Sequence, residues 1–198
     1  MTQGLPRAMQ RAIDNLSDKR FAAAMRFSMP HEGGFVNDPD DPGGATNWGV
    51  SLAYLRRLEP DLGLELGDVD NDGELTPEDM RQLPAEQAVE IYRRQWWEPQ
   101  RYDELPVSIA VKVFDLAINM GPRQAHKILQ RACRAAGGEA IADDGILGPV
   151  TVRAVMDRRE GALMPAIRSE AAGFYRGLVA ADSTRRKFIN GWLSRAYA

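Results

Sequence analysis

Val107-Ser108-Ile109-Ala110-Val111-Lys112-Val113-Phe114-Asp115-Leu116-Ala117-Ile118-Asn119-Met120 is the stretch that decides the fold, because it is apolar on almost every side of a helix. A helix without a polar face lies in the interior of a protein rather than at its surface. Gly121 and Pro122 follow immediately and end the helix. The sequence therefore predicts one buried central helix over residues 107–120.

Helical signals dominate on both sides of this stretch, and strand signals are poor. Apolar residues recur at helical spacing in 16–29, with Ser17 as a candidate N-cap, and in 84–97, which Pro84 opens. Further helices are predicted near 123–136, 162–181 and 184–197, and a short one follows Pro149. The sequence thus predicts a mainly α fold, a helical bundle around the central helix.

Composition places this chain among globular proteins with a substantial core, since 44% of its 198 residues are hydrophobic. The single cysteine, Cys133, excludes an intramolecular disulfide. No apolar run reaches the length of a membrane span. Charge is uneven, with a balance of −9 in residues 1–110 and +6 in residues 111–198. The basic half suits an anionic polymer; no nucleic-acid-binding motif accompanies it, so we expect no nucleic-acid partner.

A glycine-rich stretch from Glu32 to Thr46 carries the catalytic candidates. Its glycines and prolines suit turns rather than a helix interior, and the chain can therefore fold a second carboxylate, Asp40 or Asp41, back toward Glu32. Two carboxyl groups in different environments are the minimum equipment for cleaving a glycosidic bond. Aromatic residues that could raise the pKa of Glu32 and stack on sugars are Phe35, Trp48, Trp96 and Trp97. The alternative is a plain helix end followed by acidic turns.

Residues 68–79 fit the EF-hand calcium-loop pattern. Asp68, Asp70 and Asp72 stand at loop positions 1, 3 and 5, Gly73 at position 6 and Asp79 at position 12, while Glu74 would offer its backbone carbonyl. Hard oxygen ligands at this density favour Ca²⁺, so we expect one calcium site with a structural role, and a regulatory role is the open alternative. The alternative is a metal-free acidic turn in which Thr76 is the N-cap, Pro77 the first helical residue and Asp79 the capping-box acid.

Several of these motifs together resemble glycoside hydrolase family 108, the muramidases of phage endolysins and secretion-activator-like proteins. The resemblance rests on five stretches: Glu32-Gly33-Gly34-Phe35 with Asp41 and Thr46, Ile91–Trp97, Phe114–Gly121, Asp144–Thr151 and Lys187–Arg195. The stretch Asp144–Thr151 is similar to the peptidoglycan-binding region that follows in this family. Phe35 stands where a tyrosine is usual. The resemblance covers residues 22–197.

The resemblance implies a lysozyme-like fold and hydrolysis of the bond between N-acetylmuramic acid and N-acetylglucosamine in peptidoglycan. The family's catalytic glutamate corresponds to Glu32. Asp41 with Thr46 is expected to position water or stabilise positive charge, although the spacing leaves Asp40 open as the second carboxylate. Substrate contacts are expected from Phe35, Trp48, Trp96 and Asn119. Asn119 and Asp115, four residues apart on one helical face, either line the cleft floor or form a buried hydrogen-bonded pair.

Two regions are expected, packed as one unit: a catalytic region over 1–110 that contains the 68–79 loop, and a helical peptidoglycan-binding region over 111–198. The chain is expected to be a monomer. Residues 1–26 carry no signal-peptide core, so synthesis in a bacterial host cytoplasm and release to the wall through a holin-type membrane lesion are expected. Two rival functions remain: a lytic transglycosylase acting on the same bond, and a non-catalytic, calcium-dependent wall-binding module.

Overall fold

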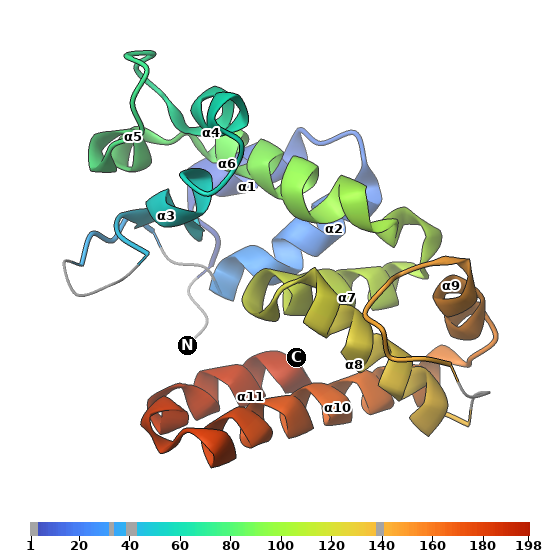
Figure 1. Cartoon of the computed structure of the whole chain (residues 1–198). Helices are drawn as coiled ribbons and strands as arrows, with labels where there is room; N and C mark the ends of the chain where they lie inside the picture. The colour runs from blue at the N-terminus through green and yellow to red at the C-terminus, as the bar shows by residue number, and fades with distance from the viewer. Residues whose placement is uncertain (1–3, 32–33, 39–42, 138–140) are drawn as a thin grey trace. The chain divides into compact units, whose positions relative to one another are not determined.

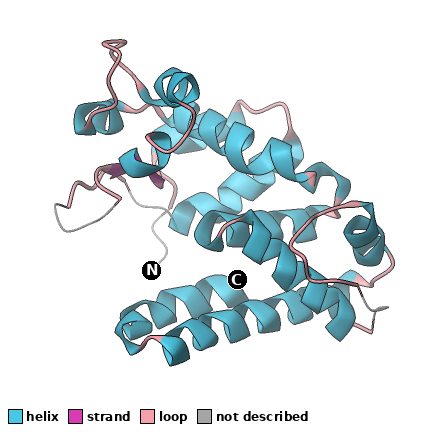
Figure 2. Cartoon of the chain, in the orientation of Figure 1, coloured by secondary structure: helices cyan, strands magenta, loops and turns pink. Residues whose placement is uncertain are grey.

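The computed structural model describes residues 4–31, 34–38, 43–137 and 141–198. Within these residues the chain forms eleven α-helices and one two-stranded sheet, so the prediction of a mainly α fold is confirmed (Figures 1 and 2). Two compact units divide the chain, Met1–Gln95 and Trp96–Ala198. In the described part of the chain, no helix combines the length and apolarity that a membrane crossing requires.

Short helices and the sheet make up the first unit. Its elements are α1 (Arg7–Asp14), α2 (Lys19–Ser28), β1 (Thr46–Asn47), β2 (Val50–Ser51), α3 (Leu52–Leu55), α4 (Pro60–Gly67), α5 (Pro77–Gln82) and α6 (Ala85–Tyr92). Helix α1 packs on α2 and α6, and Ile13, Phe21 and Met25 are fully buried in this core. A 3₁₀ turn, η1 (Met29–His31), extends α2. The glycine-rich stretch therefore begins where α2 and η1 end.

Helix α2 starts one residue later than the candidate cap Ser17 implies. Asp18 is the N-cap, and its carboxylate accepts hydrogen bonds from the backbone N–H groups of Arg20 and Phe21. A carboxylate at this position satisfies two otherwise unpaired donors and also interacts favourably with the positive end of the helix dipole. The prediction of Ser17 as the cap is wrong by one residue for this reason.

Longer helices build the second unit. They are α7 (Val107–Met120), α8 (Pro122–Ala135), α9 (Pro149–Met156), α10 (Glu160–Ala181) and α11 (Ile189–Tyr197). Helix α8 packs against α7 and α10, while α10 and α11 lie side by side (Figure 1). Gly121, with φ of +85°, turns the chain between α7 and α8, and Pro122 opens α8. Shorter turns are the π-helical η2 (Arg93–Trp97) and the 3₁₀ turns η3 (Glu98–Gln100), η4 (Tyr102–Glu104) and η5 (Ser183–Phe188).

Helix α7 has the predicted bounds and is buried along most of its length, with Ile109, Phe114 and Leu116 at 0% exposure. Each large apolar side chain buried in this way contributes roughly 1.5–3 kcal/mol. The aromatic core of the unit includes Phe114, whose ring lies 5.5 Å from that of Trp97 and 6.2 Å from that of Tyr102. Helix α7 is therefore the buried central helix that the sequence predicts, and it ends at Gly121, whose N–H still donates to the Ala117 carbonyl.

Two charged residues of α7 are nevertheless buried, Lys112 and Asp115. The Lys112 ammonium donates to the backbone carbonyl of Arg195, and the Arg195 guanidinium lies 3.7 Å from the Asp115 carboxylate. These contacts connect α7 to α11. Burial lowers the pKa of Lys112 to about 8. Asn119, in contrast, is exposed, so the alternative of a buried Asp115–Asn119 pair is wrong.

Candidate active site and acidic loop

The two predicted catalytic carboxylates, Glu32 and Asp41, lie outside the described residues, as does the alternative Asp40. The structure describes what stands on either side of them. Phe35 and Val36 follow Glu32 closely, and Thr46 follows Asp41. The contacts of these flanking residues show how the glycine-rich stretch is attached to the rest of the first unit.

A β-bridge between Val36 and Thr46 closes this stretch. The N–H of each residue donates to the carbonyl oxygen of the other, both at 2.8 Å. The hydroxyl of Thr46 also donates to the carbonyl of Gly44 at 3.4 Å. Val36 and Thr46 are thus held together by backbone hydrogen bonds, and we call the segment between these two residues the closed loop. Thr46 lies at the C-terminal end of that loop, and its role beside Asp41 stays a prediction.

Thr46 also begins a tight hairpin. Strands β1 and β2 pair antiparallel with Thr46 opposite Ser51 and Asn47 opposite Val50. Trp48 and Gly49 form the two-residue turn with φ of +53° and +78°, the backbone of a type I′ turn. Sequence reasoning missed this hairpin because two-residue strands leave no alternation of apolar and polar residues. The one local indication of a turn in the sequence is Asn47-Trp48-Gly49, which is a weak turn signal.

Trp48 is held firmly in this turn, although L-residues rarely adopt positive φ. Its indole N–H donates to the Leu83 carbonyl at 3.0 Å, and the Tyr92 hydroxyl donates to the Trp48 carbonyl at 3.1 Å. The indole N–H is thus used inside the protein, while the ring remains partly exposed. A sugar-stacking role for Trp48 stays a prediction, and it would have to use the ring face.

Helix α5 contacts the residues that flank the glycine-rich stretch. The Asn47 side-chain amide donates to the Met80 carbonyl at 2.8 Å, and the guanidinium of Arg81 lies 4.3 Å from the centre of the Phe35 ring. Because α5 is only six residues long, its last carbonyls have no partner within the helix. Asn47 supplies a partner to one of them, and Trp48 supplies one to the carbonyl of Leu83 just beyond α5. Sequence reasoning missed Asn47 and Arg81.

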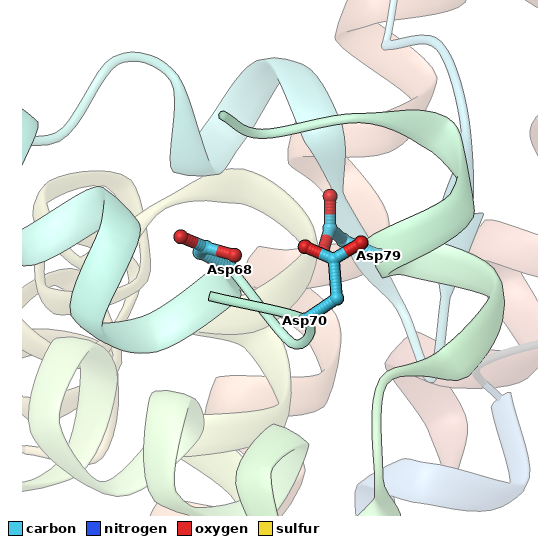
Figure 3. Close-up of side chains that lie close together, drawn as sticks. All are labelled: Asp68, Asp70 and Asp79. Atoms are coloured by element: carbon cyan, nitrogen blue, oxygen red, sulfur yellow. The ribbon is translucent and has the colours of Figure 1, made fainter. Parts of the chain in front are cut away.

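The acidic loop connects α4 to α5, and in it the carboxylates of Asp68, Asp70 and Asp79 come together with oxygen atoms within 4.8 Å of one another (Figure 3). Asn71 and Gly73 turn the loop with φ of +61° and +86°. These three aspartates form a possible acidic metal-binding group. The structure therefore brings together three of the five predicted ligands, positions 1, 3 and 12 of the pattern.

Backbone groups already bind several of these carboxylate oxygens. Asp68 accepts the N–H groups of Asp72 and Gly73 at 3.1 and 2.9 Å, and Asp72 accepts that of Glu74 at 2.8 Å. The carboxylate of Asp70 has a raised pKa because of desolvation and the neighbouring charges, first that of Asp72. The predicted ligands thus form one hydrogen-bonded loop in which negative charge is concentrated.

Asp79 belongs both to the acidic group and to the start of α5. Thr76 is the N-cap and Asp79 completes the capping box, accepting the Thr76 N–H at 2.8 Å, as the metal-free alternative predicts. Asp79 also accepts the Val69 N–H at 2.9 Å. Burial alone would raise the pKa of Asp79, but the hydrogen bonds from Thr76 and Val69 hold this pKa below its usual value. One side chain therefore fixes both ends of the loop to α5.

The remaining predicted substrate contacts, Trp96 and Asn119, belong to the second unit. Trp96 is partly exposed in the π-helical turn η2, an element often found at functional sites. The Asn119 amide oxygen accepts a hydrogen bond from the Tyr175 hydroxyl at 2.7 Å, which joins α7 to α10. Their contact with substrate stays a prediction.

Comparison with known proteins identifies the family. The family model described as Glycosyl hydrolase 108 matches residues 25–121. A solved structure, described as the structure of Brucella abortus SagA, is 30% identical, with a TM-score of 0.66, and the match covers 89% of this chain and 88% of that one. This chain belongs to glycosyl hydrolase family 108. A search of curated proteins found no match.

Membership of family 108 makes this chain a glycosyl hydrolase, as predicted. A second family model, described as Predicted Peptidoglycan domain, matches residues 124–197, which include helices α9 to α11. The family-108 match runs from α2 to Gly121 and therefore includes the closed loop, the hairpin, the acidic loop and α7. Both components of the predicted resemblance are confirmed.

Proposed function

We propose that this family-108 hydrolase is an N-acetylmuramidase that cleaves peptidoglycan between N-acetylmuramic acid and N-acetylglucosamine. One observation carries the proposal: a glycosyl hydrolase region and a peptidoglycan region follow each other in one chain, over residues 25–121 and 124–197. A glycosidase joined to a wall-binding region has its substrate held beside it, which raises the effective concentration of glycosidic bonds.

Glu32 is the proposed general acid, which protonates the leaving oxygen as the glycosidic bond breaks. Asp41, or its neighbour Asp40, is the proposed second carboxylate, and Thr46 would hold the water that completes hydrolysis. The β-bridge between Val36 and Thr46 supports this assignment, because it closes the loop that carries the second carboxylate. The separation of the two carboxylates would decide whether the anomeric configuration is inverted or retained.

The test is mass spectrometry of the soluble fragments released from purified peptidoglycan by the wild-type chain and by Glu32→Gln. We expect fragments with reducing-end N-acetylmuramic acid from the wild type and none from the variant. Glu59→Gln is the matched control, since Glu59 is an exposed glutamate of the same unit whose side chain caps no helix. Anhydro-muramic ends would assign a lytic transglycosylase instead, and fragments from Glu32→Gln at the wild-type rate would remove Glu32 from the acid role.

The proposed cofactor is one Ca²⁺ ion in the acidic loop, bound by Asp68, Asp70 and Asp79 with help from Asp72 and the Glu74 carbonyl. Oxygen ligands alone, three of them carboxylates within 4.8 Å of one another, suit a hard cation. The proposed role is structural, because Asp79 lies on α5 and α5 contacts Asn47 and the Phe35 ring. Bound Ca²⁺ would therefore stabilise the frame of the closed loop.

Calorimetric titration of the full chain with Ca²⁺ and melting temperature measured with and without chelator test this cofactor. We expect saturable binding at one site and a higher melting temperature with Ca²⁺, both lost in Asp70→Asn and both kept in Asp61→Asn, an exposed aspartate of α4 outside the loop. Loss of activity on chelation at an unchanged melting temperature would indicate regulation instead. If the titration shows no Ca²⁺ binding, the loop is the metal-free capped turn and the calcium proposal is wrong.

A further inference from the structure

The second unit contains a hollow of about 340 Å³ along helix α9 that lies outside the proposed catalytic stretch. One face of α9 and its C-cap residue form the wall, with Val150, Arg153, Ala154 and the C-cap Asp157 at positions i, i+3, i+4 and i+7. Gly137, Ile141 and Arg158 complete the lining. This volume is at the lower end of the range for small-molecule sites, so the hollow suits a single side chain of a polymer rather than a glycan strand.

The wall is held in place by helix α8. Gln130 accepts the Gly145 N–H at 2.9 Å and donates to the Thr151 hydroxyl at 3.1 Å, while Arg134 donates to the Ile141 carbonyl at 2.6 Å. The segment before α9 and the first turn of α9 are thus both bonded to α8. A site whose walls are already fixed loses little entropy when a ligand binds.

Three charged side chains line the hollow: Arg153, Arg158 and Asp157. The described residues place no ion pair on any of the three. Arg158 makes one hydrogen bond, from its guanidinium to the Asp157 carbonyl at 3.2 Å, and its Nε is buried without a hydrogen-bond partner in the described part of the chain. The guanidinium groups of Arg153 and Arg158 place two positive charges in the lining against the one negative charge of Asp157, which favours an anionic group in the hollow.

The sign of the charges specifies the ligand further. A lone carboxylate would be attracted by the two arginines and repelled by Asp157. A lone ammonium would be attracted by Asp157 and repelled by the two arginines. A group that carries an ammonium and a carboxylate on one carbon satisfies all three side chains, with the carboxylate toward the guanidinium groups and the ammonium toward Asp157. The apolar side chains of Val150, Ala154 and Ile141 would contact its aliphatic stem.

We propose that this hollow binds the zwitterionic end of a peptidoglycan stem peptide, the free amino-acid group of a diaminopimelate side chain. This inference rests on the proposed function, because peptidoglycan is the polymer that brings such a group to this chain. It also specifies which type of peptidoglycan this chain binds. Stem peptides with diaminopimelate would bind, whereas stem peptides with lysine at that position lack the carboxylate that would contact the arginines.

The test is calorimetric titration of the full chain with three peptides of the stem sequence, carrying diaminopimelate, diaminopimelate amidated at its side-chain carboxyl, or lysine. We expect the first to bind with a Kd about tenfold or more below the other two. Arg153→Gln and Asp157→Asn should each raise that Kd by a similar factor. Arg159→Gln is the matched control, because Arg159 is exposed and does not line the hollow.

Three results would overturn the inference: equal Kd values for the three peptides, no saturable binding of any of them, or an unchanged Kd in both hollow variants. Fragment release from peptidoglycan, measured with the same preparations, separates this inference from the proposed function. Fragment release without peptide binding would leave the muramidase proposal intact and show that the hollow is not a stem-peptide site. Peptide binding without fragment release would support the hollow as a stem-peptide site and contradict the muramidase proposal.

Discussion

The connection between helix α5 and the β1–β2 hairpin makes a quantitative prediction at Asn47. This side chain is 5% exposed, and its amide donates to the carbonyl of Met80, which is itself fully buried. Asn47→Ala removes the donor and leaves that carbonyl, one of the last in α5, without a partner. Leaving a buried acceptor unsatisfied costs about 1–3 kcal/mol, so we expect the first unit to lose about that much stability.

Asn47→Asp makes the prediction sharper. An aspartate has nearly the same shape, but at neutral pH its carboxylate only accepts hydrogen bonds and would face the Met80 carbonyl, another acceptor. We therefore expect Asn47→Asp to destabilise the first unit more than Asn47→Ala does. Fragment release should fall in the same order, because the hairpin begins at Thr46, the proposed partner of the second carboxylate.

Native-state hydrogen exchange is the suitable assay, since it reports the opening free energy of each unit separately. Asn190→Ala, at an exposed asparagine of α11, is the control and should change stability by no more than about 0.5 kcal/mol. The reasoning is refuted if Asn47→Ala changes the opening free energy of the first unit by less than about 0.5 kcal/mol, the limit expected for an exposed substitution. It is also refuted if Asn47→Asp is the more stable of the two Asn47 variants.

Three further predictions concern the second unit. Gly145→Ala should destabilise it, because φ at Gly145 is +81° and an added Cβ would lie 2.6 Å from the Arg123 carbonyl oxygen. Gly173→Ala should stabilise it by roughly 0.5–1 kcal/mol, because Gly173 is helical and no atom lies close to an added Cβ; thermal unfolding measures both effects. Burial lowers the pKa of His126, so the folded chain binds fewer protons than the unfolded one, and the melting temperature should fall as pH drops below about 6.5, less so in His126→Gln. Burial also lowers the pKa of Lys112 to about 8, so its unfavourable charge is fully present below pH 8 and is relieved as pH rises toward 10.5. Between pH 8 and pH 10.5 the free energy of unfolding of the wild type, relative to that of Lys112→Met, should therefore rise by at most about 3 kcal/mol, as denaturant unfolding can measure. No rise would contradict a lowered pKa for Lys112.

Sequence by itself determined the features that depend on neighbouring residues. Helix α7 follows from a run of apolar side chains ended by Gly121 and Pro122, and the start of α5 follows from Thr76, Pro77 and Asp79. Each of these signals lies within a few positions of the structure it specifies, so local propensity and capping are sufficient. The family resemblance, carried by the motifs around Glu32 and beyond, was also available from sequence.

Tertiary structure alone decided how the candidate site is supported. Asn47 and Met80 are 33 positions apart in sequence, and Trp48 and Leu83 are 35 apart, so no local pattern could indicate that α5 and the hairpin bind each other. Asp115 and Asn119 share one helical face by spacing, yet one is buried and the other exposed, because packing ends before the last turn of α7. Burial and long-range hydrogen bonds are properties of the folded chain, and they cannot be derived from residue type at a single position.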